Sequence, residues 1–147
     1  MRFGHLTKSA LGKRGEAVFA IRAGMLRKIE CVMIRVADVK AAAAYYANAF
    51  GLRPQWTDDN AIGLVFAESD AEIVLHGDHN IPSEVEVHYL VDEVVAAVAH
   101  YAAEGCHILV APCDITIGKC AVIRDPFGIR LCILDLTKGR RPMNVVE

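Results

Sequence analysis

Hydrophobic and polar residues alternate in several short segments of this chain, and a helical pattern separates the first segment from the next. Residues 28–36 alternate, which predicts a strand with one apolar face. Asp38 then occupies the N-cap position of a predicted helix over residues 38–50, and Gly51 is suited to end that helix. Further strands are predicted at residues 53–58, 61–68 and 71–76.

The same order of elements repeats after a linker at residues 77–83, which is rich in turn-forming residues. Asp92 is expected to cap the second helix. When the chain is laid over itself with an offset of 55, Val36 matches Val91 and Tyr46 matches Tyr101. The repeat predicts two βαβββ modules, residues 29–77 and 84–137. The second module's expected elements are a strand at 85–91, a helix at 92–104, a strand at 107–111, a loop at 112–118 and a hairpin at 122–134.

The turn of the final hairpin has the sequence Asp125-Pro126-Phe127-Gly128, in which proline fixes φ and glycine takes the left-handed position. One face of the strand after this turn is wholly apolar and is expected to pack on a helix. The other face carries a charge, a thiol and an apolar side chain, which suits the wall of a cup: Arg130, Cys132 and Leu134.

Composition narrows the classes of function. The 147 residues are enough for one domain with a core, and 54% of them are hydrophobic. The net charge of -2, without a basic stripe, argues against nucleic acid as a partner. No apolar run is long enough to span a membrane, so no membrane partner is expected. The five cysteines form no C-x-x-C pair, which favours a reducing, cytoplasmic location.

The N-terminal segment, residues 1–28, is basic and contains Glu16 as its single acid. We interpret it as an extension before the domain proper, which spans residues 29–137 and is followed by a tail at 138–147. The apolar run 17–21 has no place in either module. An apolar run of this kind would be an aggregation-prone patch if it were exposed to water, so we expect it to pack against a sheet edge or a second subunit. We therefore predict a homodimer.

The D-P-F-G turn at residues 125–128, the strand with one inward chemical residue after it, and the ordered repeat resemble the vicinal oxygen chelate superfamily. This superfamily includes glyoxalases, bleomycin-resistance proteins and extradiol dioxygenases. The resemblance implies an α+β fold in which two βαβββ modules form one curved mixed sheet. The helices would cover its convex face, and its concave face would form a cup.

In metal-dependent members of that superfamily, histidine or glutamate stands at four inward strand positions. The resemblance places Cys31, Val74, Glu86 and Cys132 at these positions. Valine offers no ligand atom, and thiols suit the iron or nickel of the family's enzymes poorly. We therefore predict no metal ion and no cofactor at the family position, and the sequence assigns no catalytic residue.

Two histidines lie one strand step away on the same face, His76 near Val74 and His88 near Glu86. With Glu86 they would form a shifted site for one divalent metal ion. The other interpretation is that both histidines are polar groups that line the cup without a metal. Cys31 and Cys132 likewise either fill space as small apolar residues or form a reactive pair.

The function that we predict is the binding of a small organic molecule in the cup. One alternative is a divalent-metal-dependent lyase, isomerase or dioxygenase. Another is a protein with no active pocket that uses its edges for assembly. Arg35 and Arg130 either hold an anionic group or lie at the rim, and Trp56 either stacks on a flat ligand or covers the core. The predicted lining of the cup is Cys31, Met33, Arg35, Trp56, Val74, His76, Glu86, His88, Arg130 and Cys132.

Overall fold

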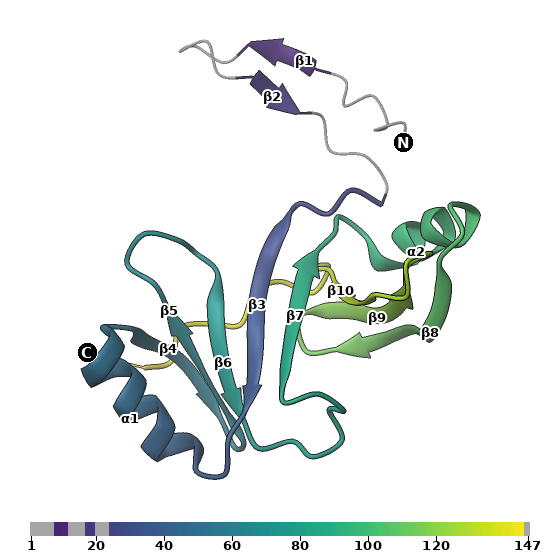
Figure 1. Cartoon of the computed structure of the whole chain (residues 1–147). Helices are drawn as coiled ribbons and strands as arrows, with labels where there is room; N and C mark the ends of the chain where they lie inside the picture. The colour runs from purple at the N-terminus through teal and green to yellow at the C-terminus, as the bar shows by residue number, and fades with distance from the viewer. Residues whose placement is uncertain (1–7, 12–16, 20–23, 146–147) are drawn as a thin grey trace.

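A computed structural model describes residues 8–11, 17–19 and 24–145, and an eight-stranded sheet forms its centre (Figure 1). The order of strands across this sheet is β4-β5-β6-β3-β7-β10-β9-β8. In chain order, the first set of elements of this sheet and its helix is β3 (Lys28–Arg35), α1 (Val39–Phe50), β4 (Arg53–Asp58), β5 (Ala61–Val65) and β6 (Glu72–His76). The second set is β7 (Val85–Leu90), α2 (Val94–Ala103), β8 (His107–Ile115), β9 (Gly118–Arg124) and β10 (Arg130–Leu134).

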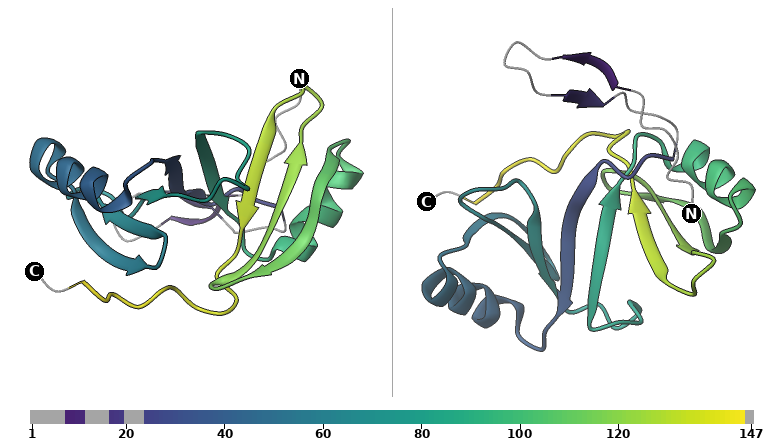
Figure 2. Two further views of the ribbon diagram at one scale, coloured as in Figure 1. Left: turned by 90° about the horizontal axis from the view of Figure 1, so that it is seen from below. Right: turned by 45° about the horizontal axis from the view of Figure 1, so that its top comes forward.

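Each set has the order strand, helix and three strands, and the first strands of the two sets are neighbours. β3 pairs with β7 in antiparallel fashion, whereas β6 runs parallel to β3 and β10 runs parallel to β7. The sheet is therefore mixed and curved, with the two helices packed against it (Figure 2). The predicted α+β fold class is confirmed.

The apolar face of each set packs under its own helix. Under α1, Leu64 and Leu75 are fully buried and contact Ala43 of the helix. Under α2, Ile133 of β10 is fully buried against Ala97. The other side chains of the strands are thereby directed to the concave face, where the functional residues lie.

The two helices begin in different ways. The Asp38 side chain accepts a hydrogen bond from the Ala41 amide at 3.0 Å, as the sequence predicts for α1. The prediction that Asp92 caps α2 is wrong, because the helix begins at Val94 and the residue at its N-cap, Glu93, makes no side-chain cap. The Val94 amide instead donates to the carboxylate of Asp135, at 2.8 Å, from beyond the end of β10.

Asp135 is fully buried and accepts hydrogen bonds through both carboxylate oxygens. Oδ2 accepts from Val94, and Oδ1 accepts from the Lys119 amide at 2.9 Å and from the Thr137 hydroxyl at 2.8 Å. One carboxylate thus connects α2, β9 and the start of the C-terminal tail. A Cβ atom at Gly118 would lie 2.2 Å from Asp135 Oδ1, so only glycine fits beside this carboxylate.

Three strand boundaries differ from the sequence predictions by three residues or more. β5 ends at Val65 and not at residue 68. β8 continues to Ile115 and β9 begins at Gly118, so both strands extend into the segment 112–121, where a loop at 112–118 and a hairpin only from 122 were predicted. β8 includes Pro112, which has no amide hydrogen and would be unfavourable inside a sheet. The residue is tolerated because β8 is an edge strand and its register shifts between Val110 and Cys113.

The N-terminal segment contributes a separate two-stranded antiparallel sheet, β1 (Lys8–Leu11) paired with β2 (Ala17–Phe19), which the sequence did not predict. The apolar run 17–21 lies only partly in the described residues. Its predicted packing against a sheet edge or a second subunit stays a prediction. Neither α1 nor α2, the helices of the described chain, is long and apolar enough for a membrane crossing.

The first prediction concerns the Asp135 carboxylate. In Asp135→Asn, the amide nitrogen replaces one acceptor and faces a backbone donor, so we expect the free energy of unfolding at pH 7 to fall by about 2–4 kcal/mol. Burial alone would raise the pKa of Asp135, but the hydrogen bonds from Val94, Lys119 and Thr137 outweigh it and lower the pKa. The wild type should therefore lose this stabilisation as the pH falls below about 4, and the variant should not.

Asp125→Asn is the matched control, since Asp125 accepts from Phe127 and Ile129 through a single oxygen that asparagine retains. Urea unfolding of both variants between pH 3 and pH 7 provides the measurement, with the pH range set by the carboxylate pKa. Equal effects of the two substitutions at pH 7 would contradict the role of Asp135.

Candidate functional site

The central strands place the predicted cup residues of both modules on neighbouring rungs of the sheet. Met33 of β3 is opposite Val74 of β6 on one side and opposite Glu86 of β7 on the other. His88 of β7 is opposite both Cys31 of β3 and Cys132 of β10. Side chains that the sequence separates by up to 101 positions, from Cys31 to Cys132, therefore share one surface.

Glu86 is the most highly connected of these residues, and its carboxylate is buried. One carboxylate oxygen, Oε1, forms an ion pair with Arg130 Nη2 at 3.0 Å, although the contact lacks the direction of a hydrogen bond. The other oxygen, Oε2, lies 3.7 Å from His88 Nε2 and 3.8 Å from Cys132 Sγ. A carboxylate, a guanidinium, an imidazole and a thiol thus meet at the centre of the sheet.

Burial decides the protonation of two of these groups. It lowers the pKa of His88, although the neighbouring Glu86 opposes the change. Burial also raises the pKa of the Cys132 thiol, and Glu86 adds to this while Arg130 opposes it. The imidazole is therefore neutral and the thiol is protonated at neutral pH. The formal charges in this cluster are those of Glu86 and Arg130.

Among the described residues, one group has the geometry of a metal site: Glu86, His88 and Cys132. One ligand atom from each lies within 4.8 Å of the others. His88 Nε2 is buried without a hydrogen-bond partner, and in the tautomer that is protonated at Nδ1 it would offer a lone pair to an ion. Oxygen, nitrogen and sulfur ligands together suit Zn²⁺, and three protein ligands leave a fourth position open. Arg130, however, already pairs with the Glu86 carboxylate.

The predicted alternative set of His76, Glu86 and His88 differs from this group in one member. His76 is buried, and its Nδ1 accepts a hydrogen bond from the Asp78 amide at 3.0 Å. Its Nε2 is buried without a hydrogen-bond partner, and burial lowers its pKa. The structure thus brings Cys132, and not His76, within reach of Glu86 and His88.

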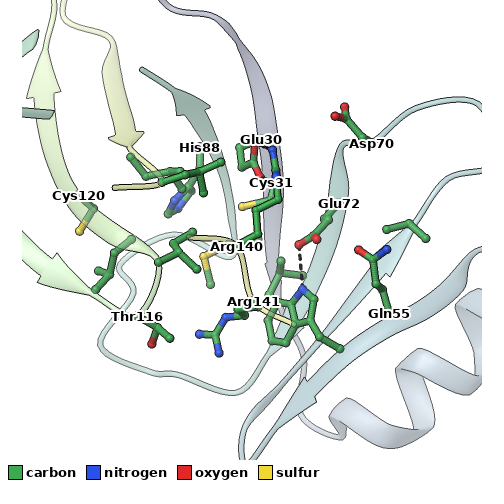
Figure 3. A pocket seen from close by; sticks show the side chains of 18 of the residues that line it. Glu30, Cys31, Gln55, Asp70, Glu72, His88, Thr116, Cys120, Arg140 and Arg141 are labelled. Atoms are coloured by element: carbon green, nitrogen blue, oxygen red, sulfur yellow. Dashed lines mark hydrogen bonds and ion pairs between the residues drawn. The ribbon is translucent and has the colours of Figure 1, made fainter. Parts of the chain in front are cut away.

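A cavity of about 730 Å³ opens on the concave face beside this cluster (Figure 3). Half of the predicted cup residues line it: Cys31, Met33, Trp56, Val74 and His88. The other predicted residues do not line it: Arg35, His76, Glu86, Arg130 and Cys132. The Arg35 guanidinium instead donates to the Ile81 carbonyl of the linker between the modules, and Arg130 pairs with Glu86.

Trp56 forms one side of the cavity and is only 6% exposed. Its indole N–H donates to Glu72 Oε2 at 2.9 Å, the interaction drawn as a dashed line in Figure 3. Burial raises the pKa of Glu72, and the indole hydrogen bond opposes the change. Gly63 lies opposite on β5, where a Cβ atom would be 2.0 Å from the indole nitrogen. Trp56 thus both covers core residues and faces the cavity.

The C-terminal tail supplies lining residues that the sequence analysis missed. Arg140 pairs with Glu30 of β3, and Arg141 lies 4.5 Å over the Trp56 ring and 3.4 Å from the Asp58 carboxylate. Figure 2 shows this tail as the yellow trace that runs from the second module towards the first. In sequence, the adjacent arginines after Gly139 are the only signal for this role.

The end of the described tail is fixed to the edge strand β4. The Asn144 side chain accepts from the Thr57 amide at 2.8 Å and donates to the Thr57 carbonyl at 2.9 Å. The Asn144 amide donates to the Gln55 carbonyl at 3.2 Å. These bonds satisfy edge groups of β4 and hold Arg140 and Arg141 at the cavity.

Comparison with known proteins gives a family and several structures of similar fold. The family model described as Glyoxalase/Bleomycin resistance protein/Dioxygenase superfamily matches residues 28–133. A search of curated proteins gave no match.

Among solved structures, methylmalonyl-CoA epimerase from Mycobacterium tuberculosis is similar with a TM-score of 0.64 and 16% identity, covering 79% of this chain and 92% of that chain. Methylmalonyl-CoA epimerase in complex with methylmalonyl-CoA and NH4+ has a TM-score of 0.64 and 15% identity, with 80% and 100% covered. A structure described as NAD-dependent benzaldehyde dehydrogenase from Legionella pneumophila has a TM-score of 0.60 and 18% identity, with 73% and 98% covered. At these identities the likeness concerns the fold.

The second prediction tests the electrostatics of the cluster around Glu86. In Glu86→Gln the negative charge that opposes the burial effect is lost, so the pKa of His88 should fall further. In Arg130→Met a positive charge is lost, so the pKa of His88 should rise. An NMR titration of the histidine ring signals measures both changes. Shifts of the same sign in the two variants would contradict the assignment.

Proposed function

Since the chain belongs to the glyoxalase/bleomycin resistance protein/dioxygenase superfamily, we propose that it binds a small organic molecule in the cavity on the concave face of its sheet. The observation that carries the proposal is the cavity itself. Its volume of about 730 Å³ lies within the range of small-molecule sites. The neighbour methylmalonyl-CoA epimerase, which shares the fold, has been solved with methylmalonyl-CoA.

The lining favours a ligand with an apolar, flat part. Met33, Val74 and Leu134 give the floor an apolar surface, and Trp56 adds an aromatic edge. Cys31 is protonated, because burial raises its pKa to about 12, so it behaves as a small apolar group here. A ligand gains stability from these contacts in proportion to the apolar area that it buries.

The charges of the lining favour a ligand with little net charge. Acidic and basic side chains are nearly balanced, with three arginines against four acids: Arg53, Arg140, Arg141, Glu30, Asp70, Glu72 and Asp78. Arg140 and Arg141 are already paired with acids. A highly anionic ligand would have to compete with these acids for the guanidinium groups. A neutral or zwitterionic aromatic compound therefore fits the lining better than a phosphorylated one.

Binding is the whole of the proposed activity, and it requires no metal. At the four family positions, Val74 offers no ligand atom and the Cys31 thiol stays protonated. Arg130 supplies the positive charge beside Glu86. We propose that this guanidinium stands where the charge of an ion would otherwise be needed.

A second candidate function rests on the group formed by Glu86, His88 and Cys132. Its donor set fits Zn²⁺, which would supply Lewis-acid polarisation of a bound carbonyl oxygen. The neutral His88 imidazole has the protonation state that a metal ligand needs, whereas Cys132 would have to lose its proton. With Zn²⁺ this candidate corresponds to a metal-dependent lyase or isomerase, whereas a dioxygenase would need a redox-active metal in its place. The ion pair between Arg130 and Glu86 disfavours this candidate, because the guanidinium already neutralises the carboxylate that would bind the ion.

Assembly as a homodimer and a cytoplasmic location remain proposals. The edge strand β8 supports the first, because it exposes three consecutive apolar side chains, Ile108, Leu109 and Val110. An exposed apolar edge strand is a surface on which a second sheet edge can pair. The location is inferred from the free cysteines and from the sequence composition alone.

The third prediction tests ligand binding in the cavity. Met33 is only partly buried and lines the cavity, so in Met33→Trp the larger side chain can extend into the open space. In a screen of neutral aromatic and anionic fragments by ligand-observed NMR, we expect the neutral aromatic compounds to bind wild type. Their affinity for Met33→Trp should fall at least roughly tenfold, since the apolar floor is blocked.

Val95→Trp is the control, because Val95 is 47% exposed on α2. Thermal unfolding of both variants verifies that each is folded. Repeating the titrations with EDTA and with added Zn²⁺ separates the two candidate functions. Binding that Met33→Trp leaves unchanged would contradict the proposed site, and binding that requires Zn²⁺ would favour the second candidate.

A further inference from the structure

Two thiols face each other on neighbouring strands at the wall of the cavity. Cys113 of the edge strand β8 is directly opposite Cys120 of β9, and their Sγ atoms are 3.3 Å apart. Residues directly opposite in an antiparallel pair have Cα atoms about 4.5–5.5 Å apart, which is within the range that a disulfide spans. The pair therefore needs only a small side-chain movement to form a bond.

The neighbouring rung fixes this arrangement. Asp114 is opposite Lys119, and its carboxylate accepts from Lys119 Nζ at 3.0 Å. Lys138 of the tail donates to the same carboxylate at 3.0 Å. The chain that follows Cys113 in β8 is thus held in register with β9. Cys120 also lines the cavity, so a change at this pair alters the cavity wall (Figure 3).

The two thiols differ in their access to solvent. Cys113 is exposed, whereas Cys120 is partly buried. Burial and the neighbouring Cys113 raise the pKa of Cys120 to about 12, so Cys120 carries little thiolate at neutral pH. Cys31, Cys106 and Cys132 also have raised pKa values because of burial. Of the five thiols, all within the described residues, Cys113 alone is exposed, so an oxidant in solution reaches it first, and Cys120 is the thiol next to it.

We propose that Cys113 and Cys120 form a redox-sensitive modification site that a hydroperoxide converts into a disulfide in the cavity wall. The Cys113 thiolate attacks the hydroperoxide, which leaves Cys113 as a sulfenic acid and releases one hydroxide or alkoxide. The Cys120 thiol then attacks the sulfenic sulfur, the S–S bond forms, and one water leaves. Two thiols lose two electrons and two protons, and the O–O bond is reduced. A small dithiol reverses the reaction by exchange.

The fourth prediction is that hydrogen peroxide, at a few equivalents over the fully reduced full-length chain, removes two of the five free thiols. The intact mass should fall by two hydrogen atoms, and peptide mapping after alkylation should join Cys113 to Cys120. Dithiothreitol should restore all the thiols. The oxidation needs no added enzyme, because the two sulfur atoms are already in contact.

Cys113→Ser and Cys120→Ser should each abolish the mass loss, whereas Cys106→Ser, the matched control, should leave it unchanged. Thermal unfolding of the reduced variants shows whether each is folded. The inference is overturned if all five thiols survive the peroxide, if another pair is bridged, or if Cys113 is converted to sulfinic acid in wild type without a bridge.

Discussion

The antiparallel pairing of β3 with β7 is the constraint on which the rest of the structure depends. It brings the first strands of two similar modules to the centre of one sheet, and each of them then takes a parallel partner from its own module. Because side chains alternate between the two faces of a strand, the pairing also sorts the residues. Apolar side chains go under the helices, and the chemically active ones gather on the concave face.

This arrangement of side chains places a negative charge in a buried position at the centre of the sheet. Glu86 is buried there, and a buried carboxylate is costly without a partner. The superfamily resemblance places Glu86 at a metal-ligand position. In this chain the ion pair with Arg130 lies at that point, and Val74 removes a second ligand. We propose that one guanidinium replaces the ion, and that the cavity beside it is left for binding rather than for metal-assisted chemistry.

Local patterns in the sequence predicted more of the fold than of the candidate site. Alternation in residues 28–36 and 85–91, and the cap and glycine around the first helix, predicted elements that the structure contains. The same parity correctly placed Cys31, Val74 and His88 on one surface. The start of α2 was misassigned because its cap, Asp135, lies 41 residues away in the sequence. No local pattern reports such a contact.

The contribution of the C-terminal tail to the cavity was missed for the same physical reason. Arg140 pairs with Glu30, which is 110 residues away in the sequence. The tail also has no periodic pattern from which its course along β4 could be predicted. Parity also could not distinguish the cup residues that line the cavity from those, such as Arg35 and Arg130, that are satisfied by other groups on the same face. The cavity depends on which side chains already have partners, and only the packed structure determines that.

The metal content of the purified full-length chain tests the central claim most directly. If Arg130 neutralises Glu86 in place of an ion, elemental analysis should find no stoichiometric nickel, iron, manganese or zinc in the wild type. Protein produced in medium supplemented with these metals should give the same result. One equivalent of any of them in the wild type, lost in Glu86→Ala, would contradict the account.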